Sequence, residues 1–300
     1  MYDLIIIGCG PAGITAAIYA VRKKITTLIL TSNIGGQTSW SGEIENYTGF
    51  RIISGPELTQ EFEEHVKKYG IPIKEHEPIT SIQKKDDIFE VTTKKDTYQS
   101  KAIIIASGKM SKRLSVPGEM EYQNKGVTYC ATCDGPLFAD KPVAIIGGGN
   151  SALDAAIQLM AICPKVYIVN ITNALTGDPV MIEKVQHNDH VEIFNNSTVK
   201  EIKGNAFVEE IVVVTSDGEK TLPVKGVFVE IGLIPNSDFG IEVTKNDHNE
   251  IIVNNKNETN IPGLFAAGDV TDVPEKQIIV AAGEGAKAAL TAVKYLYGRV

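Results

Sequence analysis

The side chains best suited to chemistry lie in one short segment, Cys130-Ala131-Thr132-Cys133-Asp134-Gly135. Two thiols separated by two residues can close into a disulfide or open into a thiol and a thiolate. A neighbouring sulfur and a helix terminus both lower the pKa of a cysteine, so that the reactive thiolate forms near neutral pH. Asp134, directly after the second cysteine, is a candidate proton donor and acceptor for the leaving thiolate. We therefore predict a redox site whose catalytic residues are Cys130, Cys133 and Asp134; the alternative is a structural pair of buried free cysteines.

The other cysteines and the histidines do not complete a metal site. The chain has four cysteines and five histidines, with a single C-x-x-C pair and no zinc-finger spacing among the histidines. A structural zinc ion is usually bound by four ligands. In a chain with so few cysteines, a C-x-x-C pair is typical of redox chemistry rather than of a disulfide scaffold. We predict no metal site, and we interpret Cys9 and Cys163 as packing residues.

A glycine-rich turn near the start of the chain indicates a nucleotide-binding fold. Residues 4–7 are apolar, Gly8-Cys9-Gly10-Pro11-Ala12-Gly13 follows, and a helical stretch continues to residue 22. In this pattern the first glycine permits the tight turn, the second lets the backbone approach a pyrophosphate and the third permits close helix packing. The helix start offers unpaired N–H groups to phosphates. We predict dinucleotide binding by Gly8, Gly10, Pro11, Ala12 and Gly13.

The same arrangement recurs in the middle of the chain. Residues 143–146 are apolar, Gly147-Gly148-Gly149-Asn150-Ser151-Ala152 forms the turn, and a helix is expected at 153–161. Two such openings indicate two nucleotide-fold modules rather than one long sheet. A second nucleotide site would use Gly147, Gly149, Asn150, Ser151 and Ala152, with Asn170 after the following strand. The alternative is that the turn is retained only for the fold.

The breaks between these modules predict an α/β protein of two Rossmann-like nucleotide-binding domains, the second inserted into the first. Turn signals lie near residues 116–118 and 232–236. Alternating segments at 87–93 and 211–215 predict a small antiparallel β addition to each domain. The expected domains are an outer one of residues 1–113 and 243–300 and an inserted one of residues 114–242, which carries the C-x-x-C pair.

Charge and hydropathy argue against several function classes. The net charge of −8 disfavours a nucleic-acid partner, which requires a basic face. The sequence has no apolar run of about 18 residues, and its first residues, MYDLIIIG, lack the basic segment and cleavage site of a signal peptide. We expect a cytoplasmic protein that binds neither nucleic acid nor membrane.

Three further polar segments are candidates for cofactor contacts. Gly36-Gln37 and Asn46 fall in predicted loops, where ordinary turn chemistry is the alternative interpretation. Gly268-Asp269 ends an apolar strand. Lys276-Gln277-Ile278 precedes a helix rich in small residues at 281–292, whose start is a candidate to face a bound ring system; a plain amphipathic closing helix is the alternative.

These motifs resemble those of the low-molecular-weight thioredoxin reductases and of the flavoprotein part of bacterial alkyl hydroperoxide reductase. The resemblance covers the whole chain, and a sulfur motif placed between two nucleotide folds is highly specific. It rests on GCGPAG at 8–13, GGQ at 35–37, ENY at 45–47, CATCDG at 130–135, GGGNSA at 147–152, GLIPN at 232–236 and AAGD at 266–269.

The resemblance implies a homodimer with FAD in the outer domain and electron passage from the flavin to the Cys130–Cys133 disulfide. By analogy Cys133 lies nearer the flavin, and Cys130 attacks thioredoxin after a domain rotation. Because no thioredoxin-like module precedes the first fold, we expect a separate thioredoxin or glutaredoxin-like acceptor. The implied FAD contacts are Gly8, Gly10, Pro11, Ala12, Gly13, Gly36, Gln37, Asn46, Gly268, Asp269, Lys276, Gln277 and Ile278.

The segment after the second glycine turn departs from the family. NADPH-dependent members carry His-Arg-Arg and a further arginine there, whereas residues 169–177 read VNITNALTG. A 2′-phosphate favours a bidentate arginine, so NADPH is disfavoured. For NADH, the acid that would bind the ribose is replaced by Asn170. The missing charged hydrogen bond costs about 1.5 to 3 kcal/mol.

If the second turn holds no nucleotide, electrons must enter elsewhere. A plant-type ferredoxin at about −400 mV can reduce a thioredoxin at about −270 mV. Residues 114–242 contain 8 Lys and Arg against 17 Asp and Glu, so the inserted module is strongly acidic. An acidic donor protein is therefore expected to bind the less acidic outer module. We predict a thioredoxin reductase whose donor is not NADPH, with ferredoxin slightly favoured over NADH. The alternatives are an NADH-dependent thioredoxin or glutaredoxin-like protein reductase, a flavin-dependent dithiol oxidase and a non-enzymatic FAD-binding redox sensor.

Overall fold

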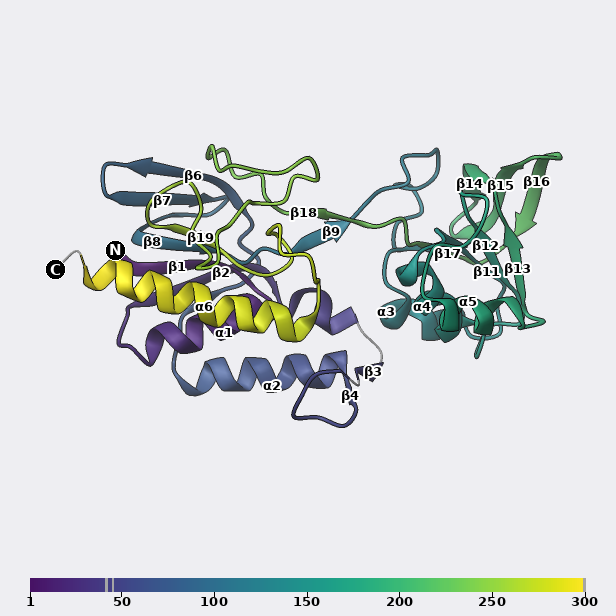
Figure 1. Cartoon of the computed structure of the whole chain (residues 1–300). Helices are drawn as coiled ribbons and strands as arrows, with labels where there is room; N and C mark the ends of the chain where they lie inside the picture. Colours follow the sequence, from purple (N-terminus) through teal and green to yellow (C-terminus); the bar gives the residue numbers. More distant parts are fainter. Residues whose placement is uncertain (41–42, 45, 299–300) are drawn as a thin grey trace. The chain divides into compact units, whose positions relative to one another are not determined.

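The computed structural model describes residues 1–40, 43–44 and 46–298. The chain divides into two compact units (Figure 1): unit 1 is Met1–Met110 with Ile234–Val300, and unit 2 is Ser111–Leu233. The second unit is therefore inserted into the first. The chain returns to unit 1 at residue 234 rather than at the expected 243, because Phe239 is already buried in the core of unit 1.

Unit 1 is built on a mainly parallel sheet. Its order is β5-β2-β1-β8-β7-β6, and β19 pairs with β8. The antiparallel pair β6–β7 is the small β addition that the sequence predicts for this domain, and it extends the main sheet through β7 and β8. The strands are β1 (Tyr2–Cys9), β2 (Thr27–Ile34), β5 (Ile73–Lys74), β6 (Ile79–Lys85), β7 (Ile88–Thr93), β8 (Thr97–Ile105) and β19 (Leu264–Ala266).

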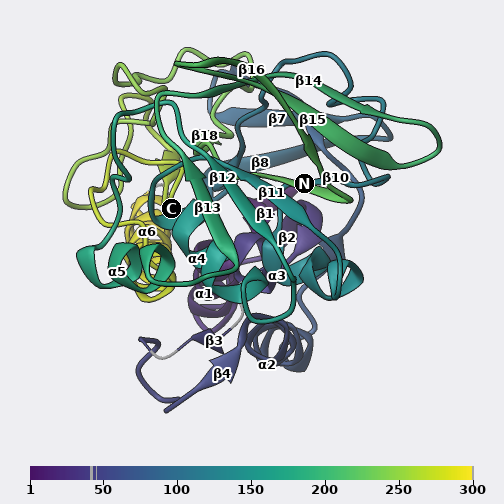
Figure 2. The ribbon, with the colours of Figure 1, turned by 90° about the vertical axis from the view of Figure 1, so that its right-hand side faces the viewer.

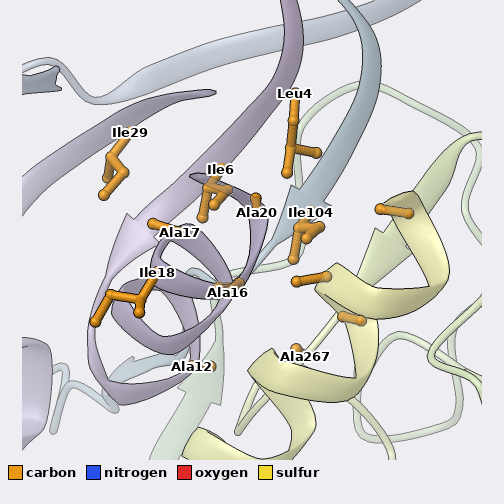
Figure 3. Close-up of a cluster of buried hydrophobic side chains, with 14 of the residues drawn as sticks. Leu4, Ile6, Ala12, Ala16, Ala17, Ile18, Ala20, Ile29, Ile104 and Ala267 are labelled. Atoms are coloured by element: carbon orange, nitrogen blue, oxygen red, sulfur yellow. The ribbon is translucent and has the colours of Figure 1, made fainter. Parts of the chain in front are cut away.

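The core of unit 1 explains why an apolar run and an alanine-rich helix follow each other in the sequence. Leu4 and Ile6 of β1 are fully buried between parallel neighbours, as is typical of strands covered on both faces. Helix α1 (Pro11–Val21) lays its small residues, among them Ala16 and Ala17, on this sheet (Figure 3). Small side chains allow the helix to lie close to the strands, which fixes the glycine turn that joins them.

Two longer helices complete unit 1. Helix α2 (Gly55–Lys68) begins with a reciprocal capping box, in which Ser54 and Glu57 bond each other's backbone N–H groups. Helix α6 (Ile278–Tyr297) packs against α1. The remaining elements of unit 1 are the short helix η1 (Gly36–Trp40) and the strands β3 (Glu43–Ile44) and β4 (Ile53–Ser54).

Unit 2 repeats the parallel pattern. Its main sheet has the order β10-β17-β11-β12-β13, and β11, β12 and β13 lie side by side (Figure 2). A separate antiparallel sheet, β14-β15-β16, is the predicted β addition of this domain. The strands are β10 (Val127–Thr128), β11 (Val143–Ile146), β12 (Val166–Val169), β13 (Val191–Phe194), β14 (Thr198–Gly204), β15 (Val208–Thr215), β16 (Gly218–Pro223) and β17 (Gly226–Val229).

The helices of unit 2 follow the strand ends at which nucleotide folds place their ligands. They are α3 (Ala131–Asp134), η2 (Gly135–Phe138), α4 (Asn150–Leu159) and α5 (Pro179–Gln186). The two crossings between the units run through β9 (Lys109–Ser111) and β18 (Leu233–Pro235), which pair with each other. The predicted fold class, two Rossmann-like domains with small antiparallel additions, is confirmed.

Candidate cofactor and redox sites

The first glycine turn has the geometry of a phosphate cradle. Gly8 has φ +104°, and a Cβ there would lie 2.2 Å from the carbonyl oxygen of Ala106; a Cβ on Gly13 would lie 2.0 Å from the oxygen of Gly8. Pro11 begins α1, and the N-cap residue Gly10 supplies no side chain to cap it. The first N–H groups of α1 are therefore directed at the space where a dinucleotide's phosphates bind.

A second loop borders this cradle. The N–H of Gly35 donates to the carbonyl of Cys9 at 2.8 Å. Gly36, with φ +57°, lies beside Gly10, and a Cβ there would be in ordinary van der Waals contact with the Gly10 Cα at 3.7 Å. Beneath the loop, the buried Oγ1 of Thr59 has no hydrogen-bond partner among the described residues. The predicted contacts Gly10 and Gly36 are thus brought together. Thr59 is a further polar group that no sequence motif indicates.

The C-terminal segment supplies the third wall. Gly268, with φ +77°, lies against α1, where a Cβ would be 3.0 Å from the Cβ of Ala12. Asp269 follows, and burial raises its pKa, although Lys276 and Lys109 pull it down. Gln277 accepts a hydrogen bond from Asn46 Nδ2 at 3.1 Å. Ile278, the last predicted contact, is the first residue of α6; Glu45 of the ENY motif lies outside the described residues.

A buried ion cluster that the sequence did not predict adjoins this wall. One carboxylate oxygen of Glu250 lies 3.1 Å from Lys109 Nζ and 2.9 Å from Lys276 Nζ. The side chain of Lys109 is 15% exposed, that of Glu250 is 12% exposed and that of Lys276 is 24% exposed. Burial alone would raise the pKa of Glu250, but hydrogen bonds from Asn246, Lys276 and Lys109 lower it to about 2. Glu250 is therefore ionised at neutral pH.

These features fit an FAD molecule. Its pyrophosphate requires a glycine cradle at a helix start, which Gly8, Gly10 and Gly13 provide, and its polar chain requires bonding groups such as Asp269 and Thr59. The three walls come from segments far apart in the chain, and all belong to unit 1. Unit 1 therefore contains the glycine turn and the polar side chains that this cofactor requires.

The redox segment lies at the carboxyl end of a strand of unit 2. Cys130 follows β10 and is disulfide-bonded. Its N–H donates to Thr128 Oγ1 at 3.2 Å, and the same hydroxyl donates to the carboxylate of Asp134. The N–H of Asp134 in turn donates to the carbonyl of Cys130 at 3.2 Å. Cys133 belongs to α3, and its side chain lies outside the described residues.

Thr128 therefore joins the two ends of the redox segment. Its side chain is 6% exposed, so its hydrogen bonds are shielded from water. Thr128 does not stand out in the sequence, because a threonine at the end of a strand is an ordinary β residue. The signal that could have found it is its position two residues before the first cysteine, where a hydroxyl can bond a backbone N–H.

The other two cysteines are free thiols in closed environments. Cys9 and Cys163 are each 2% exposed. Burial, with a smaller contribution from Glu63 and Glu75, raises the pKa of Cys9 to about 12. Burial likewise raises the pKa of Cys163 to about 11, with a smaller contribution from Asp140. Both thiols are therefore protonated at neutral pH.

The second glycine turn keeps the backbone geometry of the first. Gly147 has φ +137°, and a Cβ there would lie 2.1 Å from the carbonyl oxygen of Glu230. Gly149 precedes α4 as its N-cap. Asn150, however, accepts a hydrogen bond from the N–H of Asp178 at 2.7 Å. This bond connects the loop before α5 to the second glycine turn. Ser151 is exposed in the first turn of α4 and Ala152 is buried beneath it.

Asn170 is held by its own loop and by Asn195, which follows β13. Its Nδ2 donates to the carbonyls of Thr172 and Ala174, at 3.2 and 3.0 Å, and to Asn195 Oδ1 at 2.9 Å. Its Oδ1 accepts from the N–H and the hydroxyl of Thr172. The residue is 2% exposed, and its amide lies where a Cβ on Gly148 would be 2.3 Å away. Its polar atoms are thus used inside the protein.

A carboxyl group also lies beside this turn. Glu230 directly follows β17, whose last residue, Val229, pairs with Ile146 just before Gly147. Burial raises the pKa of Glu230 to about 8, and the neighbouring Asp154 contributes to the increase. Desolvation also raises the pKa of Asp154, partly offset by a hydrogen bond from Gln158.

Neither a metal centre nor a membrane span is found in the described part of the chain. Within residues 1–40, 43–44 and 46–298, no group of three or more His, Cys, Asp or Glu side chains is placed to hold a metal ion. No described helix is both long and apolar enough to cross a membrane.

Comparisons with known proteins place this geometry in a family. Two nucleotide folds, a cradle for a flavin dinucleotide and a disulfide at a strand end define a flavin-linked disulfide oxidoreductase. The family model for pyridine nucleotide-disulphide oxidoreductases matches residues 2–285. The chain belongs to this FAD-binding family, which confirms the assignment made from the motifs.

Three similar proteins illustrate the range of the family. An NADH dehydrogenase of Bacillus subtilis is 41% identical over 98% of this chain and 58% of its own length. Lactococcus lactis thioredoxin reductase (FR conformation) has a TM-score of 0.91, with 35% identity, 99% of this chain and 100% of that chain covered. A ferredoxin-flavin thioredoxin reductase from Clostridium acetobutylicum has a TM-score of 0.55, with 34% identity and 99% and 98% covered. The chain spans somewhat under three fifths of the curated relatives it matches.

Proposed function

We propose that the protein is a flavin-dependent disulfide reductase that passes electrons through FAD in unit 1 to the Cys130–Cys133 pair and on to thioredoxin or a thioredoxin-like protein. We propose further that it works as a homodimer and that its electron donor is not NADPH. The proposal is supported by one observation: Cys130 is disulfide-bonded, and Thr128 holds the carboxylate of Asp134 next to it by a hydrogen bond. The other unit of the chain has the glycine turn that FAD requires.

The residues of unit 2 have defined tasks in this chemistry. Opening the disulfide consumes two electrons and two protons and leaves two thiols. Asp134 is the group that gives a proton to, or takes one from, the thiol that attacks or leaves. Thr128 keeps the carboxylate at the segment that reacts. FAD, when bound, supplies an electron carrier that accepts electrons singly and delivers them as a pair.

The two cysteines divide the work by their positions in the segment. Cys130 precedes α3 and is partly exposed, so we assign to it the attack on the disulfide of the acceptor protein. Cys133 then receives the electrons that regenerate the dithiol. This assignment follows the family resemblance of the CATCDG motif.

The donor proposal rests on Asn170 and its loop. A nicotinamide nucleotide needs a group that bonds its ribose, and every polar atom of Asn170 is already engaged within unit 2. No arginine or lysine occurs in residues 169–177 to bind a 2′-phosphate. A relative is named as ferredoxin-flavin thioredoxin reductase, and another as NADH dehydrogenase. We therefore propose ferredoxin as the donor ahead of NADH.

An anaerobic titration tests the proposal. The FAD-loaded protein is mixed in turn with NADPH, NADH and photochemically reduced ferredoxin, and flavin bleaching is followed by absorbance. We expect rapid bleaching with ferredoxin only, followed by reduction of added thioredoxin. Rapid bleaching by micromolar NADPH or NADH would overturn the donor proposal.

A pair of cysteine variants tests the acceptor side. Cys130→Ser should abolish thioredoxin reduction while FAD remains bound. Cys163→Ser, which replaces a buried thiol bonded to the carbonyl of Phe138, should leave thioredoxin reduction unchanged. If Cys130→Ser still reduces thioredoxin, the reductase assignment is wrong. It is also wrong if the wild-type protein consumes oxygen rapidly with a small dithiol and does not reduce thioredoxin.

A further inference from the structure

The Lys109–Glu250–Lys276 cluster joins three segments of unit 1. Lys109 is the first residue of β9, Glu250 lies in the returning segment before β19, and Lys276 precedes α6. Asn246 Nδ2 donates to the second oxygen of Glu250 at 2.7 Å, and Lys276 Nζ also donates to the carbonyl of Thr271. Each charged group therefore has fixed partners.

The cluster lies against residues assigned to the cofactor. The carbonyl of Lys109 accepts a hydrogen bond from Gln37 Nε2 at 3.5 Å. Lys276 directly precedes Gln277, which holds Asn46. Both lysines and Glu250 act electrostatically on Asp269. Three predicted FAD contacts, Gln37, Asp269 and Gln277, thus adjoin the cluster, although none of the family motifs contains Lys109 or Glu250.

The charge balance of this cluster depends on Lys109. With it, the two carboxyl groups of Glu250 and Asp269 face two ammonium groups. Without it, they would face Lys276 alone, and the wall of the cradle would become negative. Two-electron reduction of bound FAD takes up two electrons and one proton and so adds one negative charge to the ligand. A buried charge beside a flavin is one of the means by which a protein sets its potential.

We propose that Lys109, held by Glu250, raises the reduction potential of the FAD bound in unit 1. This inference rests on the flavin binding that belongs to the proposed function. It gives Lys109 a role that does not require contact with the substrate: it favours transfer of electrons into the flavin. The sign of the effect is fixed by charge, because removing a cation and removing an anion from the same cluster must act in opposite directions.

The test measures the flavin potential rather than turnover. FAD-loaded wild type, Lys109→Met and Glu250→Gln are reduced anaerobically with dithionite in the presence of a redox dye of known potential. We expect Lys109→Met to shift the equilibrium toward oxidised flavin roughly tenfold, which corresponds to about 30 mV for two electrons. Glu250→Gln should shift it toward reduced flavin by a similar factor.

Two further variants separate charge from structure. Lys109→Arg keeps the positive charge and should keep the wild-type potential. Lys101→Met breaks another lysine ion pair of the same unit, that with Asp3 at 2.8 Å, and should leave the potential within twofold of wild type. If Lys109→Met does not fold, the opposite-signed shift of Glu250→Gln and the unchanged value of Lys109→Arg still test the proposal.

The outcomes distinguish this inference from the proposed function. If the wild-type protein binds no FAD, both fail. If FAD binds but Lys109→Met and Glu250→Gln shift the potential in the same direction, or each by less than twofold, the cluster is only a structural tie and the inference is wrong while the proposed function stands.

Discussion

The hydroxyl of Thr128 donates a hydrogen bond to the carboxylate of Asp134 and accepts one from the N–H of Cys130. Thr128→Val keeps the shape of the buried side chain and removes both bonds. A lost hydrogen bond to a charged group costs about 1.5 to 3 kcal/mol, or roughly ten- to a hundredfold. We expect thioredoxin reduction to slow by about tenfold with the FAD content unchanged, as measured by steady-state turnover and flavin absorbance.

Thr221→Val is the matched control for this prediction. Thr221 is an exposed threonine of β16 in the same unit, so its replacement should leave turnover at the wild-type rate. Equal turnover of Thr128→Val and wild type would mean that the position of Asp134 does not depend on this hydroxyl.

The saturated amide of Asn170 predicts a structural rather than a ligand-binding phenotype. Asn170→Ala removes a buried amide whose hydrogen bonds tie the exposed loop of Thr172 and Ala174 to Asn195. We expect unit 2 to lose about 2 kcal/mol or more of stability, measured by denaturant unfolding. Asn173→Ala, at an exposed position of the same loop, should cost less than about 0.5 kcal/mol. A stable Asn170→Ala protein with weakened NADH binding would contradict this view.

Glu230 predicts a pH dependence of stability. Its pKa in the folded protein is about 8, above the ordinary value of 4.5. Between those values the folded state holds a proton that the unfolded state has released, so the contribution of Glu230 to stability is present below pH 4.5 and is lost as the pH rises through about 8. Glu230→Gln removes this loss. The free energy of unfolding of the variant, relative to that of wild type, should increase as the pH rises, by at most about 1.4 kcal/mol per pH unit.

Denaturant unfolding at pH values inside and above this window measures the difference. Glu183→Gln replaces an exposed glutamate of α5 and should show a stability difference from wild type that does not vary with pH. A Glu230→Gln difference that is equally constant would show that the Glu230 carboxyl is not protonated in the folded protein.

Two glycines of α6 make a matched pair. A Cβ on Gly285 would lie 2.0 Å from the carbonyl oxygen of Ala12, whereas a Cβ on Gly283 would meet nothing within 4 Å. Gly285→Ala should therefore push α6 away from α1. We expect it to lower the free energy of unfolding by about 1 to 3 kcal/mol and to weaken FAD retention. Gly283→Ala should raise the unfolding free energy by about 0.4 to 1 kcal/mol. Thermal unfolding and flavin release on dilution measure both, and an undamaged Gly285→Ala protein would refute the close packing of the two helices.

The parts of the fold that could be predicted are those governed by local chemistry. An apolar run followed by closely spaced glycines predicts a strand, a turn and a helix, because only glycine accepts the positive φ of Gly8 and the close approach at Gly13. The repetition of this pattern at Gly147 predicted the second domain. The exact return to unit 1 could not be read from the turn signals, since it depends on which core buries Phe239.

The parts of the site that could not be predicted depend on tertiary contacts. Lys109 and Glu250 are 141 residues apart in the chain, and no spacing rule relates them. Thr128 acquires its importance from the turn that brings Asp134 back to it. Asn170 was a candidate ribose contact by position alone, and only the folded loop shows that Thr172, Ala174 and Asn195 occupy its amide.

The burial of Cys9 and Cys163 makes the protein a selective target for thiol reagents. Maleimides and haloacetamides react with thiolates, and both side chains are sheltered and protonated at neutral pH. A fluorescent or mass tag added without prior reduction will therefore mark only those molecules in which the C-x-x-C segment is already a dithiol. The fraction of molecules tagged then reads out the oxidation state of the native protein directly, in a cell extract as well as in a purified sample, without any need to mutate the two remaining cysteines.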